Sequence, residues 1–251
     1  MRKFLFLLAA LGTLSLTGCL ETEQEVSLKE DGSGTISITN DMSSLIGLMK
    51  QMGGGAALEK AGDKKLDSTI VLANTIDSIP NLSSEEREMA KTGVLKINAD
   101  FKAEKFVTKI SFPFAKPSQI PAYNKLAGKI MAEVMKDKMA DGAPMGTEDM
   151  PEASSIDDYY KVEYSEGELT RKVDKDKYAG AGSDEYLKGI NEAASMGLEM
   201  KASYVIRLPR PATKAEGKNV KLSDDKKTVT LSGTLEDFFD DPSSFEFKIK
   251  Y

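Results

Sequence analysis

Apolar and polar residues alternate in several short segments of this chain, and this alternation constrains the fold more than any other feature. It is clearest at 95–101 and 106–112, where apolar residues occupy nearly every second position. Successive side chains of a strand point to opposite faces, so a period of two predicts strands with one buried and one solvated face. Strands of this kind pair mainly as antiparallel hairpins.

Three hairpins are predicted, and a helical segment follows each of them. The hairpins pair 24–29 with 35–40, 95–101 with 106–112, and 159–164 with 168–173. The helical segments that follow them are 43–52, 118–140 and 183–196. The chain is then expected to end in strands at 202–208, 219–222, 228–231 and 245–251, with a helical turn at 234–239.

Local signals mark where the helices begin. The capping-box pattern of Ser83 and Glu86 opens a further short helix at 83–92. Pro121 suits the first turn of the helix at 118–140, and Ser183 is the expected N-cap of the helix at 183–196.

These segments predict an α+β fold, in which an antiparallel sheet is built from successive β-hairpins and helices pack on one face. Residues 19–251 are expected to form a single ectodomain after a signal peptide at 1–18. The segment 141–156 is rich in Gly, Pro, Met, Ser and acidic residues, which predicts a flexible insertion.

Composition excludes several kinds of catalytic site. The chain contains no histidine, no tryptophan and a single cysteine. Catalysis by Ser-His-Asp or Cys-His groups is therefore excluded, as are histidine-ligated zinc and copper sites. We expect no enzymatic activity, no cofactor and no metal, although carboxylate chemistry remains open to the acidic residues. The formal net charge of −6 argues against nucleic acid as a partner.

The single cysteine, Cys19, follows a segment with the layout of a secretory signal. Two basic residues precede an apolar stretch at 4–11, which is too short to span a bilayer well. The segment ends in Leu16-Thr17-Gly18-Cys19, which resembles the lipobox of bacterial lipoproteins. This resemblance implies cleavage between Gly18 and Cys19 and attachment of diacylglycerol to the thiol.

The lipid on Cys19 is the expected contact between this protein and a membrane. Acylation of the freed amine, for example with palmitate, adds the further chain that a stable anchor needs, because one acyl chain binds bilayers only marginally. By resemblance to Gram-negative lipoproteins, Leu20 permits transfer to the outer membrane. We therefore expect a lipoprotein of the bacterial cell envelope, with the periplasmic or surface face left open.

Turn motifs near the two ends of the chain resemble the LppM-like domain of bacterial envelope lipoproteins. They are Asp-Gly-Ser-Gly at 31–34, a strand that ends in Leu-Pro at 208–209, and the turn Asp-Asp-Lys-Lys at 224–227. The resemblance leaves the middle of the chain unmatched. It implies an α+β ectodomain that holds lipid or another hydrophobic molecule. A likeness to lipoproteins of Bacteroidetes-type bacteria implies no function.

Several groups of side chains are candidates for a binding site. Methionines recur in two predicted helices, as Met131, Met135 and Met139 and as Met42, Met49 and Met52. Thioethers suit core packing, an adaptable lipid pocket or a soft metal, in that order of expectation. The acidic run at 236–241 lacks the EF-hand spacing, so a solvated helical turn is favoured over calcium ligation. The pair Asp157-Asp158 is interpreted as the start of a helix or of a strand, Asp224-Asp225 as a hairpin turn, and Tyr159-Tyr160 as ordinary strand composition.

The leading hypothesis is a non-enzymatic lipoprotein that binds a hydrophobic ligand such as a lipid, or an envelope partner. Ligand binding predicts an apolar groove between the sheet and the helix at 118–140. A protein-interaction component of the envelope predicts an exposed apolar patch and no cavity. A carboxylate-based hydrolase, the least favoured alternative, requires two acids that converge about 5–10 Å apart.

Replacement of Cys19 removes the thiol to which the lipid is attached. We expect the Cys19→Ser variant to move from the membrane to the soluble fraction, because its acyl chains are lost, and cell fractionation with immunoblotting measures this. Leu20→Ile keeps the thiol and serves as the control. Undiminished membrane retention of the cysteine variant would contradict the lipoprotein hypothesis.

Overall fold

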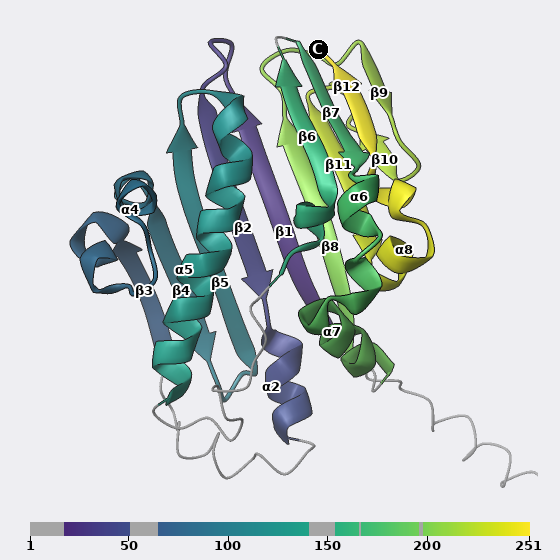
Figure 1. Ribbon diagram of the computed structural model, residues 1–251. Helices are drawn as coiled ribbons and strands as arrows, with labels where there is room; N and C mark the ends of the chain where they lie inside the picture. The colour runs from purple at the N-terminus through teal and green to yellow at the C-terminus, as the bar shows by residue number, and fades with distance from the viewer. Residues whose placement is uncertain (1–17, 51–64, 141–153, 166, 196–197) are drawn as a thin grey trace, which may run out of the picture.

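The computed structural model describes residues 18–50, 65–140, 154–165, 167–195 and 198–251. Its main element is an eight-stranded sheet in the order β10-β11-β8-β1-β2-β5-β4-β3 (Figure 1). The strands are β1 (Gly18–Leu28), β2 (Gly34–Asp41), β3 (Lys65–Val71), β4 (Val94–Asp100), β5 (Lys105–Phe114), β8 (Leu198–Arg207), β10 (Val220–Leu222) and β11 (Thr228–Thr234).

One pair of strands at the centre of this sheet is parallel. β1 pairs with β8 in a register that runs from Gly18 opposite Leu198 to Ser27 opposite Arg207. The other neighbouring strands of the sheet pair antiparallel. β1 also forms a hairpin with β2, which turns through Gly32 at a φ of 79° that glycine tolerates. The first strand therefore joins the N-terminal strands to the C-terminal ones.

A second sheet has four strands, all antiparallel, in the order β6-β7-β12-β9. The strands are β6 (Tyr160–Ser165), β7 (Glu168–Val173), β12 (Phe247–Lys250) and β9 (Lys214–Glu216). The last strand of the chain lies between β7 and β9, so the small sheet is complete only when the C-terminus is in place.

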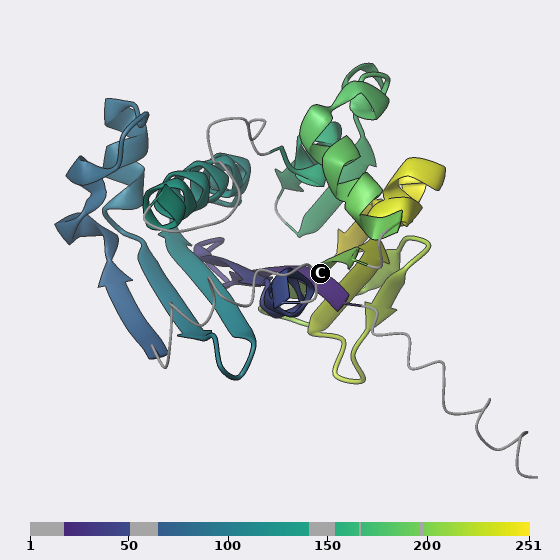
Figure 2. The ribbon, with the colours of Figure 1, turned by 90° about the horizontal axis from the view of Figure 1, so that it is seen from below.

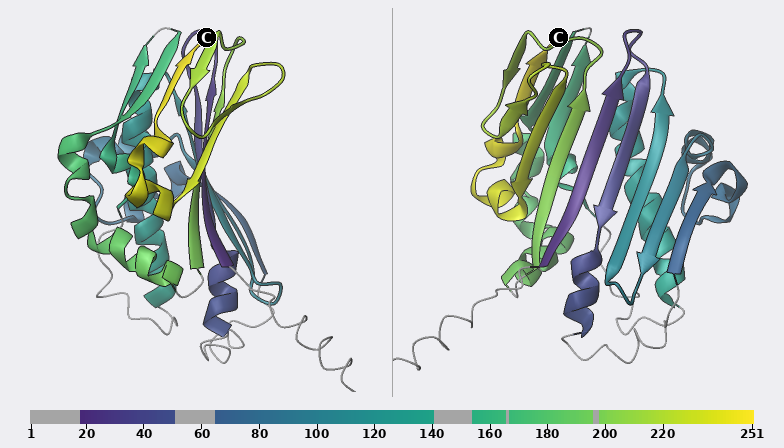
Figure 3. Two further views of the ribbon diagram at one scale, coloured as in Figure 1. Left: turned by 90° about the vertical axis from the view of Figure 1, so that its right-hand side faces the viewer. Right: turned by 180° about the vertical axis from the view of Figure 1, so that it is seen from behind.

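The helices and the small sheet lie on the same face of the large sheet (Figure 3, left). On that face, α4 (Ser84–Ala90) and α5 (Ile120–Ala140) cover the side of β2, β5 and β4. The shorter helices α6 (Lys175–Tyr178), α7 (Glu185–Ser195) and α8 (Leu235–Asp240) lie on the side of the small sheet. α2 (Ser43–Met49) extends from the end of β2. Seen from behind, the opposite face of the large sheet carries no helix among the described residues (Figure 3, right).

The core lies between the large sheet and these covering elements. Alternate residues of the strands point into it and are buried, among them Val26, Ile36, Ile110, Phe112 and Ile206. The ring of Phe112 stacks on that of Tyr123 in α5, with 5.0 Å between the ring centroids. Phe238 of α8 is fully buried and contacts the rings of Tyr159, Tyr160 and Tyr178. Both groups of helices are therefore held by aromatic packing.

The α+β class, the successive antiparallel hairpins and the helices on one face are confirmed. Three details differ from the prediction. β1 begins at Gly18 instead of residue 24, because β8 continues beside it. Asp184 and not Ser183 caps α7, since its Oδ1 accepts the Leu187 N–H at 2.9 Å. The sequence predicts neither β3 nor β9, because each is an edge strand with little apolar alternation.

Some predictions concern parts of the chain that lie outside the described residues. These are residues 1–17 of the signal peptide, residues 141–153 of the insertion, Met52, and the side chains of Met49, Met135 and Met139. Within the described ranges, the structure contains no helix that is both long and apolar enough to cross a membrane.

Two glycines test the packing on α5 and β4. A Cβ on Gly93 would lie 2.4 Å from the Phe112 ring, whereas a Cβ on Gly128 of α5 would meet nothing within 4 Å. We expect Gly93→Ala to lower the free energy of unfolding by about 1–3 kcal/mol through overpacking. Gly128→Ala should raise it by about 1 kcal/mol through helix propensity. Thermal denaturation followed by circular dichroism measures both, and equal destabilisation by the two changes would contradict this packing.

Candidate functional site

A groove of about 990 Å³ lies between α5 and the small sheet, over the covered face of the large sheet. Figure 2 shows these three elements from below, with α5 on one side and the small sheet and its helices on the other. Small-molecule ligands commonly occupy cavities of about 300–1,000 Å³. The groove has the position that the ligand-binding hypothesis requires, between the sheet and the long helix.

Apolar side chains form much of the floor and walls of the groove. The large sheet contributes Val26, Ile38, Met200, Ala202 and Ile206, α5 contributes Ile120, Ala127 and Met131, and the opposite wall contributes Ile156, Val162 and Phe247. Met131 is one of the methionines that the sequence analysis selected, and Met200 is one that it missed. Gly128 also lines the groove, and at this position the surface of α5 carries no side chain.

A charged side chain of the small sheet is buried at the groove. Arg171 in β7 is 2% exposed and lines the groove. Its Nη1 donates to Asp157 Oδ1 at 2.5 Å. Asp157 lies in the 3-10 helix η7 (Ile156–Tyr159), which leads into β6. Because a buried charge is costly unless it is paired, this ion pair fixes η7 against β7.

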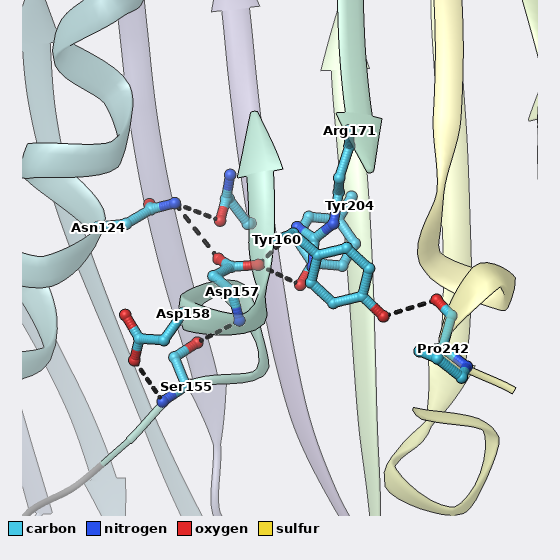
Figure 4. Close-up of polar contacts among 9 residues, drawn as sticks. Asn124, Ser155, Asp157, Asp158, Tyr160, Arg171, Tyr204 and Pro242 are labelled. Atoms are coloured by element: carbon cyan, nitrogen blue, oxygen red, sulfur yellow. Dashed lines mark hydrogen bonds and ion pairs between the residues drawn. The ribbon is translucent and has the colours of Figure 1, made fainter. Parts of the chain in front are cut away.

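Two tyrosine rings enclose the guanidinium group of Arg171. Its Cζ lies 4.1 Å from the centroid of the Tyr160 ring and 4.3 Å from that of the Tyr204 ring (Figure 4). Tyr160 donates its O–H to the Pro242 carbonyl at 2.7 Å, and Tyr204 donates its O–H to Asp157 Oδ1 at 2.6 Å. The hydrogen bonds fix both rings, and cation–π attraction holds the guanidinium between them.

Asn124 connects this cluster to α5 and to the floor of the groove. Its Nδ2 donates to Gln24 Oε1 at 2.9 Å and to Asp157 Oδ2 at 3.3 Å. Gln24 belongs to β1, so the polar network touches the long helix, η7, the small sheet and the large sheet. Asp157 accepts hydrogen bonds from three donors, which is most of the number that a carboxylate can accept.

Several polar atoms of the network lack a hydrogen-bond partner. Nε and Nη2 of Arg171 and Oδ1 of Asn124 are buried without a hydrogen bond among the described residues. A buried donor without an acceptor costs about 1–3 kcal/mol, and native proteins contain few of them. Unsatisfied donors on a residue that lines a groove are therefore candidate ligand contacts.

The electrostatics keep the arginine charged and the tyrosines neutral. Burial raises the pKa of both Tyr160 and Tyr204 above the ordinary value for a phenol. Burial opposes the charge of Arg171, but the Asp157 carboxylate outweighs it and holds the pKa of the guanidinium above its usual value. The cluster therefore presents a permanent cation at neutral pH.

The sequence alone does not predict this cluster. Asp157 is predicted at the start of a helix or strand, and it does lie in the first turn of η7, but its pairing with Arg171 is not predicted. Tyr160 was interpreted as an ordinary strand residue. One signal was available, because Leu169, Arg171 and Val173 alternate along one strand, which puts a charge at a position of the apolar series.

Three of the other acidic candidates have structural partners. Asp237 accepts the Thr234 N–H at 2.7 Å and so completes the capping box of α8, whose N-cap is Thr234, and Asp241 forms an ion pair with Lys218. Asp225 accepts the Lys227 N–H at 3.0 Å in the turn between β10 and β11. No three histidine, cysteine, aspartate or glutamate side chains gather into a metal site among the residues that the structure describes.

Cys19 lies at the start of β1, where its Sγ is 3.6 Å from Glu199 Oε2 on β8. A second hollow, of about 500 Å³, lies on the uncovered face of the large sheet and includes charged side chains such as Glu21 and Lys201. The strand that begins at the expected lipid anchor therefore runs beneath the groove on one face and beside this hollow on the other.

The comparisons with known proteins give a distant structural likeness. No protein-family model matches the chain, and no curated protein matches it significantly. The NMR structure of the folded domain of LppM from Mycobacterium tuberculosis aligns over 94% of this chain and 91% of that chain, with a TM-score of 0.39 and 9% sequence identity. The likeness to Bacteroidetes-type lipoproteins stays a prediction.

The hydroxyl of Tyr204 tests the polar network. We expect Tyr204→Phe to lower the free energy of unfolding by about 1 kcal/mol, because Asp157 loses one of its three donors. Tyr186 of α7 also lines the groove, but its hydroxyl has no hydrogen bond to a described residue, so Tyr186→Phe is the matched control. Chemical denaturation measures both variants. Equal stability of the wild type and Tyr204→Phe would contradict the role given to this hydroxyl.

Proposed function

We propose that this chain is a lipid-anchored lipoprotein of the bacterial cell envelope whose ectodomain binds a hydrophobic ligand, in the first instance a lipid. The observation that carries the proposal is the groove between α5, the large sheet and the small sheet. The lipobox-like segment that ends at Cys19 supports the anchor, and Leu20 after it supports the outer membrane as the destination.

The character of the groove supports an apolar ligand. Its floor presents Val26, Ile38 and Ile206, and its walls present flexible Met131 from one side and aromatic rings from the other. Methionine adapts its shape to irregular apolar surfaces, which suits a chain-like ligand. Burial of each methylene group in such a groove contributes roughly 0.8 kcal/mol to binding.

The path of β1 supports access from a membrane. Thr22 lies three residues beyond Cys19 on this strand and lines the groove. At the rise of a strand, about 3.4 Å per residue, one end of the groove is about 10 Å from the lipidated residue. A lipid that leaves the bilayer beside the anchor therefore has a short distance to travel.

The acidic groups of the groove favour binding over hydrolysis. Asp157 accepts from three donors, Asp158 accepts the Ser155 N–H at 3.1 Å, and Glu133 accepts from Asn81 at 2.7 Å. A carboxylate-based hydrolase needs one acid and one base free to exchange protons with the substrate. We therefore propose a non-enzymatic role without cofactor or metal.

A protein partner in the envelope is the second candidate function. The edge strand β3 favours it, because Leu66 is 47% exposed and Val71 is 46% exposed on that strand. An edge strand with exposed apolar side chains offers free backbone groups to a strand of another protein.

A variant that fills the groove tests the ligand hypothesis. Gly128→Trp projects a large ring from α5 into open space at the groove, and Gly182→Trp is the control, because Gly182 is exposed and has nothing within 4 Å. We expect the full-length lipoprotein, purified in detergent from its own host, to carry a non-covalent lipid in native mass spectrometry. The Gly128→Trp variant should lose it, and Gly182→Trp should keep it.

Two results would contradict the proposal. The first is a wild-type protein without any non-covalent lipid. The second is a Gly128→Trp variant that folds, as circular dichroism shows, and still carries as much lipid as the wild type. Strand-mediated binding to an envelope protein would then be the remaining candidate.

A further inference from the structure

The buried arginine of the groove points to the chemistry of the ligand. We infer that the ligand carries an anionic oxygen group, a carboxylate or a phosphate, that accepts hydrogen bonds from Nε and Nη2 of Arg171. The inference rests on the proposed function and makes it more specific, because it selects acidic amphiphiles over neutral ones.

The two unpartnered nitrogens of Arg171 form one edge of the guanidinium plane. Nε and Nη2 are both buried and both without a hydrogen bond among the described residues. Along this edge a guanidinium group presents two parallel N–H bonds, which match the two oxygens of a carboxylate or phosphate. The remaining nitrogen, Nη1, is already bonded to Asp157.

Two rings and a carboxylate surround the rest of the Arg171 guanidinium group. Tyr160 and Tyr204 lie over the two faces of the plane, at 4.1 and 4.3 Å from Cζ. Asp157 occupies the side of Nη1. Since the rings and the carboxylate are themselves fixed by hydrogen bonds to Pro242, Tyr204 and Asn124, the edge has a defined orientation before a ligand arrives.

The charges around the groove are consistent with an anion. Asp157 balances the charge of Arg171 but is satisfied by its own three donors, so it does not use the free edge. Lys125 and Lys177 also line the groove, and neither forms an ion pair within the described ranges. The opposing carboxylates, Asp158 and Glu133, are engaged by Ser155 and Asn81.

Access to the edge requires a small rearrangement. Arg171 lines the groove, yet it is only 2% exposed. A head group must therefore displace neighbouring side chains of the groove before it reaches the two nitrogens. Phe247 and Val162, the cross-strand neighbours of Arg171, also line the groove and are the nearest candidates for such movement.

The test compares two lipids that differ only in the phosphate. The mature lipoprotein in detergent is titrated with dioleoyl phosphatidic acid and with dioleoylglycerol, and native mass spectrometry measures the bound fraction. We expect phosphatidic acid to bind about tenfold more tightly, because charge-assisted bidentate hydrogen bonds form only with the phosphate. Inorganic phosphate, titrated alone, distinguishes a lipid head group from a free anion.

The decisive variant is Arg171→Lys. Lysine keeps the positive charge and an ion pair with Asp157 but lacks the two-pronged edge, so the preference for phosphatidic acid should fall to within about threefold. Arg207→Lys is the matched control, because Arg207 pairs with Glu25 outside the groove. If Arg171→Lys unfolds, the double variant Arg171→Met/Asp157→Asn is used in its place. It removes both charges of the ion pair together.

The possible results distinguish the anion site from lipid binding. Equal binding of the two lipids by the wild type would overturn the anion site but not the proposed function. The same holds if the folded Arg171 variants prefer phosphatidic acid over dioleoylglycerol as strongly as the wild type does. Arg171-dependent binding of inorganic phosphate, with neither lipid bound, would support the anion site and overturn lipid binding. Absence of binding by all three probes would overturn both.

Discussion

The ion pair between Arg171 and Asp157 connects the parts of this protein that surround the groove. Arg171 comes from the small sheet, Asp157 from η7, Tyr204 from the large sheet, and Asn124 from α5, and each of them is hydrogen bonded to at least one other. A buried ion pair of this kind is weak evidence for stability, because desolvation offsets much of the attraction. Its clearer effect is on geometry, because it fixes the small sheet relative to α5 above the large sheet.

The same cluster divides the groove by polarity. Val26, Ile38 and Ile206 present an apolar floor, while Gln24, Asn124 and Asp157 form a polar belt across it. A ligand that fits both regions is amphiphilic, with a chain for the floor and a polar group for the belt. Lipids of the membrane to which the anchor would attach the protein have this construction.

Much of the fold could be predicted from local patterns, and the site could not. The hairpins, the capping box at Ser83 and the long helix depend on residues close in the sequence, so periodicity and turn chemistry identify them. The division of the strands into two sheets, and the parallel pair of β1 and β8, depend on contacts between distant segments that no local pattern encodes.

The candidate site also depends on contacts between segments that are distant in the sequence. The cluster draws its residues from separate elements, as Asp157, Arg171 and Tyr204 show. The segment around each of them has the composition of an ordinary turn or strand. Only the position of Arg171 within the alternation of β7 was informative, because it puts a charge where an apolar residue is expected. A groove beside the long helix is required by the ligand hypothesis, but the sequence does not establish that one exists, and the small sheet that forms its opposite wall was not separated from the large one.

The parallel pairing of β1 with β8 has a consequence for the order of folding. Residues 18–27 pair with residues 198–207, so the central strand of the large sheet lacks one partner until most of the chain has been synthesised. Pairings this far apart in sequence form slowly, because loop closure must precede the contacts that reward it. The eight-stranded sheet therefore joins its two halves only after residues 198–207 have been added to the chain. The topology thus leaves one side of β1 without its neighbour until about the last fifth of the chain has been made.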